Sequence, residues 1–67
     1  MDSDAAAVRL QAIHDEVFEL YLVAERVLLI ASHLDGDVTL LRLKRDELRH
    51  LAAGYAQLAA DARRTTR

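Results

Sequence analysis

The sequence contains no cysteine, no proline and no tryptophan, and it has only two glycines in 67 residues. Without cysteine the chain can form neither a disulfide nor a thiolate metal site, and this absence fits a reducing compartment. A chain of this length buries too little apolar surface by itself to be comfortably stable. We therefore expect one small domain that is stabilised by oligomerisation or by a bound partner.

No proline interrupts the chain, and the first glycine is Gly36. Gly36 can adopt the left-handed conformation that ends a helix, and Asp37 or Thr39 can cap the helix that follows. The sequence therefore predicts a single all-α domain. Its elements are a helix over about 4–34, a turn at 35–37 and a helix over about 38–64. Because the connection is short, the two helices are expected to pack as an antiparallel helical hairpin.

The longest apolar stretch, residues 17–31, has twelve apolar residues among its fifteen. Glu19, Glu25 and Arg26 interrupt it, so it falls short of the roughly 20 apolar residues that a membrane span requires. The first residues lack the basic and apolar regions of a signal peptide. We therefore expect a soluble, cytoplasmic protein with no membrane partner.

The first helix carries more apolar surface than one neighbouring helix can cover. At 100° per residue its inner stripe consists of Val17, Leu20, Ala24, Val27, Ala31 and Leu34. Val23 and Ile30 widen this stripe, whereas Leu22 and Leu29 lie nearly opposite it. A partner helix from the same chain covers only one side, so the remainder indicates a second copy or another protein.

The second helix has an inner stripe of Leu41, Leu48, Leu51, Tyr55, Leu58 and Ala62. Its predicted outer face carries Arg42, Arg45 and Arg49, and Gly54 is interpreted as a point of close helix packing. The interface residues predicted from both helices are Val17, Leu20, Leu22, Val23, Val27, Leu29, Ile30, Leu34, Leu48, Leu51, Tyr55 and Leu58.

Charge divides the chain into two unlike halves. Residues 1–37 carry eight acids against two bases, a net charge of −6, and residues 38–67 carry seven bases against three acids, a net charge of +4. Opposite charges of this kind set the pairing of an antiparallel hairpin or of a head-to-tail dimer. The alternative is that Arg42, Arg45 and Arg49 form a basic edge that follows nucleic-acid phosphates. Hairpin dimers of the Rop type bind RNA with such a shape, but the net charge of −2 and the three aromatic residues disfavour this interpretation.

Glu47 and His50 form a Glu-x-x-His pair, which is similar to the element that ferritin-like di-iron bundles use twice. That resemblance implies a third ligand from a facing helix. If facing residues have numbers that sum to about 73, Glu25 supplies it, and two hairpins related by a twofold axis provide two copies of Glu25, Glu47 and His50. The alternative is that Glu47 pairs with a nearby arginine and His50 is solvated.

The sequence has no glycine-rich phosphate loop and no recognisable arrangement of nucleophile and base, so we expect neither an enzyme nor a cofactor. The pattern favours a small protein–protein interaction module, such as an adaptor, a chaperone-like subunit or a regulator. We expect it to pair with itself, as a homodimeric four-helix bundle or a higher oligomer, and also to bind another protein.

Overall fold

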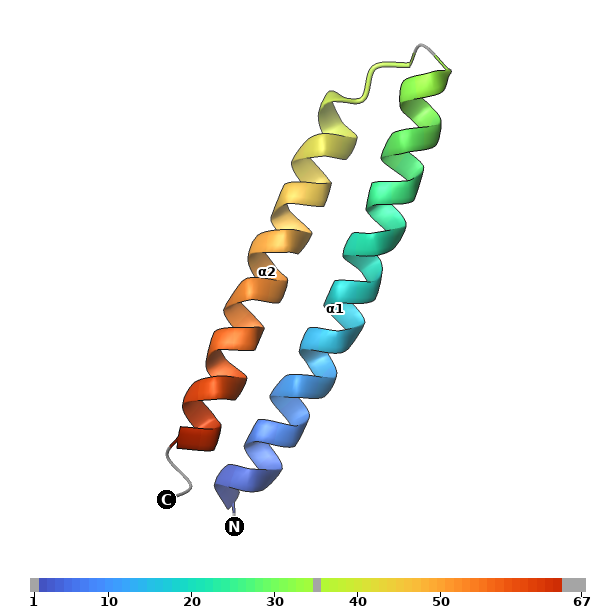
Figure 1. Cartoon of the computed structure of the whole chain (residues 1–67). Helices are drawn as coiled ribbons and strands as arrows, with labels where there is room; N and C mark the ends of the chain where they lie inside the picture. The colour runs from blue at the N-terminus through green and yellow to red at the C-terminus, as the bar shows by residue number, and fades with distance from the viewer. Residues whose placement is uncertain (1, 35, 65–67) are drawn as a thin grey trace.

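The computed structural model describes residues 2–34 and 36–64, with side chains from Asp4 onward. Helix α1 spans Asp2–His33 and helix α2 spans Thr39–Arg64. The two helices lie side by side and run in opposite directions (Figure 1), and the described residues contain no strand. The predicted helical hairpin is confirmed, with helix ends within two residues of those expected. The predicted turn includes Asp35, which lies outside the described residues.

Helix α1 ends by tightening its last turn. The backbone N–H of Leu34 donates to the carbonyl of Ala31 over 3.1 Å, an i to i−3 bond of the kind that closes many helices. Gly36 follows with a backbone conformation outside the left-handed region, so the expectation of a left-handed glycine there is wrong. A Cβ atom at Gly36 would lie 3.8 Å from the carbonyl oxygen of Ala31, an ordinary contact.

Helix α2 begins with a side-chain cap. The backbone N–H of Thr39 donates to Oδ1 of Asp37 over 3.0 Å, and the N–H of Arg42 donates to the carbonyl of Val38 over 2.9 Å. The predicted cap at Asp37 is confirmed, because its carboxylate accepts a backbone donor that has no partner within the helix. This hydrogen bond from the Thr39 backbone, with a second from the Thr39 side chain, lowers the pKa of Asp37.

The helices meet along a line of buried and half-buried residues that recur at intervals of three and four. On α1 these are Ala7, Leu10, His14, Val17, Tyr21, Ala24, Leu28 and Ala31. On α2 they are Val38, Leu41, Arg45, Leu48, Ala52, Tyr55, Ala59 and Ala62. We call these residues the seam. Their heptad spacing is that of an antiparallel coiled coil.

The seam encloses little apolar volume. Among the described residues the buried ones are Ala7, Leu28, Ala52 and Ala59, and no large side chain is fully buried. The molecule is a rod of 52 × 13 × 11 Å with a radius of gyration of 15.4 Å. A compact domain of this length has a radius of gyration of about 11 Å. The hairpin therefore lacks the further layer of structure that would cover its helices.

The seam runs along a different line from the predicted stripes. Leu20, Val27 and Leu34 were expected at the centre of the stripe on α1, but they lie beside the seam and are exposed. A fixed angle of 100° per residue drifts by about 20° per heptad from a seam with a period of 3.5 residues. On α2 Arg45 belongs to the seam and not to the outer face. Gly54 is no close-packing point within the hairpin, because a Cβ there would meet no atom within 4 Å.

Candidate functional site

Apolar side chains extend along the hairpin on one side of the seam. On α1, Ile13, Leu20 and Val27 each directly precede a seam residue, and Leu51 and Leu58 do the same on α2. In two antiparallel helices that share a seam, residues that precede the equivalent seam positions lie on the same side of the pair. These five residues therefore form one strip that is two helices wide.

The strip is widened on α1 by a second heptad run. Leu20, Val23, Val27, Ile30 and Leu34 follow one another at intervals of three and four, as the seam residues do. We call the combined surface the apolar side: Ile13, Leu20, Val23, Val27, Ile30, Leu34, Leu51 and Leu58. These side chains are between 39 % and 75 % exposed. Heptad spacing is typical of a surface that packs against another helix.

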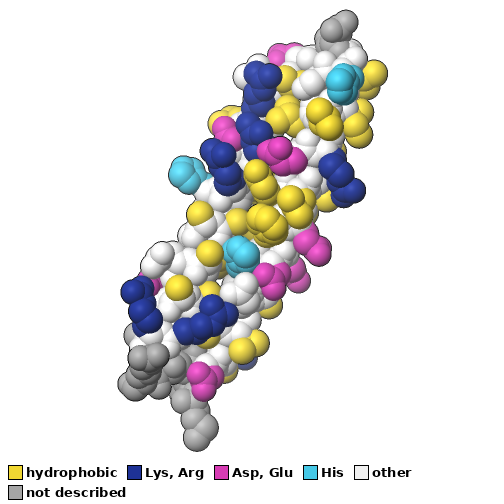
Figure 2. Space-filling model, viewed as in Figure 1, with side chains coloured by type: hydrophobic (Ala, Val, Ile, Leu, Met, Phe, Trp, Pro, Cys, Tyr) yellow, Lys and Arg dark blue, Asp and Glu magenta, His cyan; other side chains and the backbone are white. Residues whose placement is uncertain are grey.

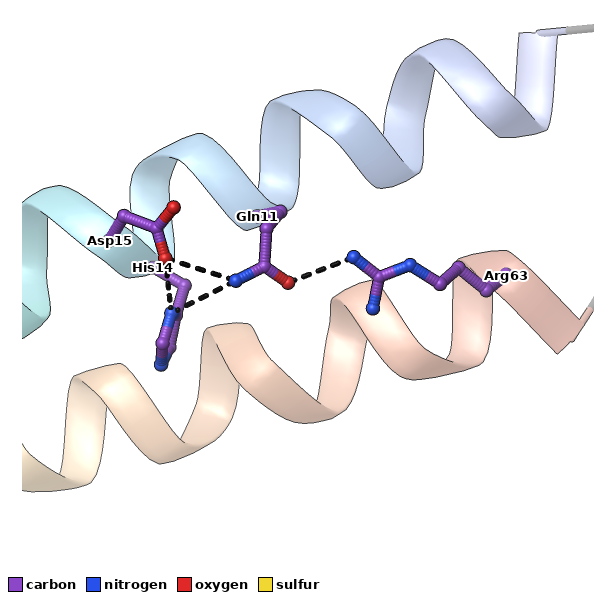
Figure 3. Close-up of polar contacts among 4 residues, drawn as sticks. All are labelled: Gln11, His14, Asp15 and Arg63. Carbon is purple, nitrogen blue, oxygen red and sulfur yellow. Dashed lines mark hydrogen bonds and ion pairs between the residues drawn. The ribbon is translucent and has the colours of Figure 1, made fainter.

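The opposite side of the seam, which we call the polar side, carries hydrogen bonds between the helices, with Phe18, Leu22 and Leu29 exposed among its polar residues. Arg63 on α2 donates from Nη2 to Oε1 of Gln11 on α1 over 2.9 Å. Gln11 in turn donates from Nε2 to Oδ1 of Asp15 over 3.0 Å, and Nδ1 of His14 lies 3.0 Å from the same oxygen (Figure 3). The hydrogen bond from His14, followed by that from Gln11, lowers the pKa of Asp15.

A second polar contact crosses the seam nearer the connection. Arg45 donates from Nη1 to Oε1 of Glu25 over 2.8 Å and from Nε to Oδ1 of Asp46 over 2.8 Å. Its side chain is only 24 % exposed. The hydrogen bond to Glu25, with that to Asp46, raises the pKa of Arg45, so the guanidinium stays charged within the seam.

The residues proposed as metal ligands are not brought together within one hairpin. Glu25 is engaged by Arg45, and Oε2 of Glu47 lies 3.4 Å from Nζ of Lys44, while His50 is exposed. In residues 4–34 and 36–64 no three His, Cys, Asp or Glu side chains are placed to hold a metal ion. The residue numbers of the two hydrogen-bonded pairs between the helices sum to 70 for Glu25 with Arg45 and to 74 for Gln11 with Arg63, close to the predicted 73. A metal site shared between two hairpins stays a prediction.

The predicted basic edge is divided by the seam. Arg42 and Arg49 are exposed, but Arg45 points to Glu25 across the seam. On the face shown in Figure 2, acidic and basic side chains are interspersed along both helices, and hydrophobic side chains are more concentrated in the half nearer the connection. A continuous row of three arginines therefore does not form.

A shallow hollow of about 310 Å³ lies between the helices. It is lined by His14, Phe18, Tyr21, Arg49, Ala52 and Ala53. The rings of His14 and Phe18 are stacked with centroids 5.8 Å apart, and Phe18 and Tyr21 are separated by the same distance. The hollow forms because alanines on α2 face these rings, and its volume is at the lower limit for small-molecule sites.

Of the predicted interface residues, Val17, Leu48 and Tyr55 belong to the hairpin's own seam. Outside the seam lie Leu20, Leu22, Val23, Val27, Leu29, Ile30, Leu34, Leu51 and Leu58, all exposed. The predicted interface residues do not include Ala7, Ala52 and Ala59, whose small side chains are the most buried. The signal that finds them is the unbroken alternation of three and four residues from Ala7 to Ala31 and from Val38 to Ala62.

The chain matches no family model, and no curated protein or solved structure matches it significantly. Neither described helix is long and apolar enough to cross a lipid bilayer.

Proposed function

We propose that the protein is a small protein–protein interaction module, of the adaptor or chaperone-like class, that binds through the apolar side of the hairpin. The observation that carries this proposal is the exposure of the apolar side: Leu20 is 56 % exposed and Val27 is 43 % exposed. Scattered apolar residues are normal on a surface, whereas a continuous strip marks a binding surface.

The half of α1 nearer the connection supports this proposal most strongly. Between residues 20 and 34 its apolar residues include Tyr21 and Leu28 in the seam, Val27 on the apolar side and Leu29 on the opposite flank. A helix that is apolar on nearly all sides is normally buried by neighbours on more than one side. Helix α2 covers only one of them.

The small size of the hydrophobic core also supports binding through the apolar side. Three alanines and one leucine are the buried residues in the described part of the chain. Domains of fewer than about 70 residues rarely gain enough stability from one hydrophobic core. Packing a further helical layer on the apolar side would complete a four-helix bundle, in which each helix uses its seam positions and one flanking position.

The polar side is suited to remain in water. Its contacts join exposed groups such as Arg63 and Gln11, and Arg49 has an exposed side chain beside the hollow. The two sides of one hairpin therefore have different roles: the apolar side binds, and the polar side fixes how α1 and α2 lie against each other.

Site-specific photocrosslinking in cells tests this proposal without naming the partner in advance. A photoreactive phenylalanine analogue is placed at Val27 on the apolar side and, as a matched control, at the neighbouring Arg26 on the outer face of α1. We expect protein adducts, including adducts with the chain itself, from position 27 and few from position 26. Equal yields at the two positions, or no adduct from position 27, would contradict the proposal.

A further inference from the structure

We infer that the partner on the apolar side is a second copy of this chain, which packs with its connection at the same end and places its α2 beside α1 of the first copy. This inference depends on the proposed function, because it names the occupant of the same surface. Its basis is the width of the apolar side, the distribution of apolar residues along it and the charges of the two helices.

The apolar side matches a second hairpin in shape. The apolar side spans both helices, because Leu20 and Val27 come from α1 and Leu51 and Leu58 come from α2. A single added helix would cover a strip one helix wide and leave the other uncovered. A second hairpin has the same width and the same length of 52 Å, and its own apolar side would be covered in the same contact. A twofold interface uses one surface on both copies in this way.

The hairpin has enough accessible surface for a stable dimer interface. A standard interface covers about 800 Å² on each partner. The hairpin has an accessible surface of 5290 Å², so such an interface takes about 15 % of it. The rod therefore has enough surface for an interface of this size along one of its long sides.

The apolar residues of α1 are distributed unevenly along the rod. On α1 the apolar side is continuous from Leu20 to Leu34, near the connection, whereas Glu16 and Arg9 occupy the equivalent positions toward the N-terminus. If both connections lie at the same end, Leu20 and Ile13 of one copy face Leu51 and Leu58 of the other, whereas Val27 faces the apolar stem of Lys44. If one copy is turned end for end with full overlap, the apolar half of each copy faces the more polar half of the other.

The two helices carry opposite net charges. Helix α1 has a net charge of −4, from six acids and two bases, and α2 has a net charge of +3, from six bases and three acids. Placing α1 beside the second copy's α2 brings unlike charges together on both sides of the twofold axis. Toward the far end, Arg9 on α1 and Asp61 on α2 lie at equivalent heptad positions at the same level, so two copies aligned in this way would form that pair twice.

Charged residues interrupt the apolar side of α2 at one level. Lys44 precedes the seam residue Arg45, and Glu47 lies one turn further along. Their side chains pair with each other, with Nζ and Oε2 3.4 Å apart, and both are more than half exposed. Long charged side chains of this kind lay their apolar stems over a surface and keep the charged ends in water.

Two lysine substitutions on α1 test the surface. Ile30 is 61 % exposed on the apolar side, and its neighbour Leu29 is 62 % exposed on the opposite flank, so the two changes add the same charge at equal exposure. We expect Ile30→Lys to weaken self-association at least tenfold in sedimentation equilibrium and Leu29→Lys to leave the two-chain mass unchanged. Equal weakening by both, or no weakening by Ile30→Lys, overturns the inference.

Spin-label distances test the arrangement independently of those variants. The chain has no cysteine, so Ala5→Cys and Gly36→Cys, made separately, each introduce one label per copy. With both connections at one end, the two labels in the dimer of each variant lie within roughly 30 Å of each other. In an end-for-end dimer at least one pair is more than roughly 45 Å apart, because 31 residues separate the sites at 1.5 Å per residue. A distance above that value, or a monomeric mass without dipolar coupling, overturns the inference.

The photocrosslinking experiment separates this inference from the proposed function. An adduct from position 27 with the mass of two chains supports both the second copy as the partner and the proposed function. If the chain is a monomer and position 27 forms adducts only with a different protein, the second copy is excluded as the occupant and the proposed function stands. If the chain is a monomer and no adduct forms, both are contradicted.

Discussion

Arg45 of α2 crosses the seam and donates from Nη1 to Oε1 of Glu25 on α1 over 2.8 Å. No other Asp, Glu, Lys or Arg occupies a seam position in the described part of the chain. A charged residue at one position of a mostly apolar coiled-coil seam fixes register at a cost in stability. The Arg45–Glu25 pair therefore acts as the feature that sets how α1 and α2 align.

Arg45→Leu should raise the melting temperature, because an apolar side chain packs better at a seam position than a guanidinium. Glu25 is left without its partner but keeps its access to water, since its side chain is 40 % exposed. Thermal unfolding followed by circular dichroism, at one protein concentration, measures the change. Arg42→Leu on the exposed surface is the control and should leave the melting temperature nearly unchanged. A lower melting temperature for Arg45→Leu would show that the ion pair contributes net stability.

Gly36→Ala should increase the free energy of unfolding by about 0.4–1 kcal/mol. The backbone at Gly36 lies outside the left-handed region and leaves space for a Cβ, so the gain comes from the smaller conformational freedom of the unfolded chain. Urea unfolding of the two proteins at equal concentration provides the comparison. Destabilisation instead would mean that Gly36 adopts the left-handed conformation that its place after a helix suggests.

Acid should destabilise the hairpin through Asp15 and Asp37. Hydrogen bonds lower the pKa of both carboxyl groups from the ordinary value of 3.8, that of Asp15 chiefly through His14 and that of Asp37 chiefly through the Thr39 backbone. A carboxyl group with a lowered folded-state pKa gives stability that is present above the unfolded-state pKa and is lost as pH falls through the folded-state value.

The melting temperature is therefore expected to fall as the pH drops from 5 to below 3.8. Asp37→Ser keeps a capping oxygen but no ionisable group, so it should reduce this fall while leaving the helix capped. The measurement is a series of thermal melts against pH for both proteins. Superimposable pH profiles for the two would contradict the assigned role of Asp37.

Glu47→Ala distinguishes an ion-pair residue from a metal ligand. In the hairpin Glu47 is exposed and pairs with Lys44, so its removal should cost about 1 kcal/mol or less, and a chelator should not change the melting temperature. Elemental analysis of protein purified without a histidine tag is the direct measurement, and we expect no stoichiometric metal. About one ion or more per two chains, with loss of several kcal/mol on chelation, would favour a shared site with Glu25 and His50.

The sequence predicted the secondary structure well because it contains few residues that interrupt a helix. With no proline and only one glycine before the second helix, a single connection near Gly36 was the only break available, and Asp37 was the natural cap. The antiparallel hairpin follows directly from the short connection. These predictions depend on interactions between residues that are close in the sequence. They therefore require no knowledge of how distant residues pack.

The phase of the seam was harder to predict because side-chain size misled the choice of stripe. Leu51 and Leu58 are more apolar than Ala52 and Ala59, yet the alanines are buried and the leucines lie beside them. Close approach of two helices favours small residues at their contact. The alanines therefore occupy the seam, and the larger leucines lie beside it. The position of Arg45 had the same cause, since an arginine is expected on an outer face unless its partner on the other helix is known.

The dependence of the melting temperature on protein concentration tests the central claim most directly. If the apolar side is covered by association, folding and assembly are linked, and mass action requires the melting temperature to rise with concentration. We expect this rise over a hundredfold range, together with a mass in sedimentation equilibrium of about twice the 7.5 kDa of one chain. A folded helical protein of 7.5 kDa whose melting temperature is the same at every concentration would contradict the account.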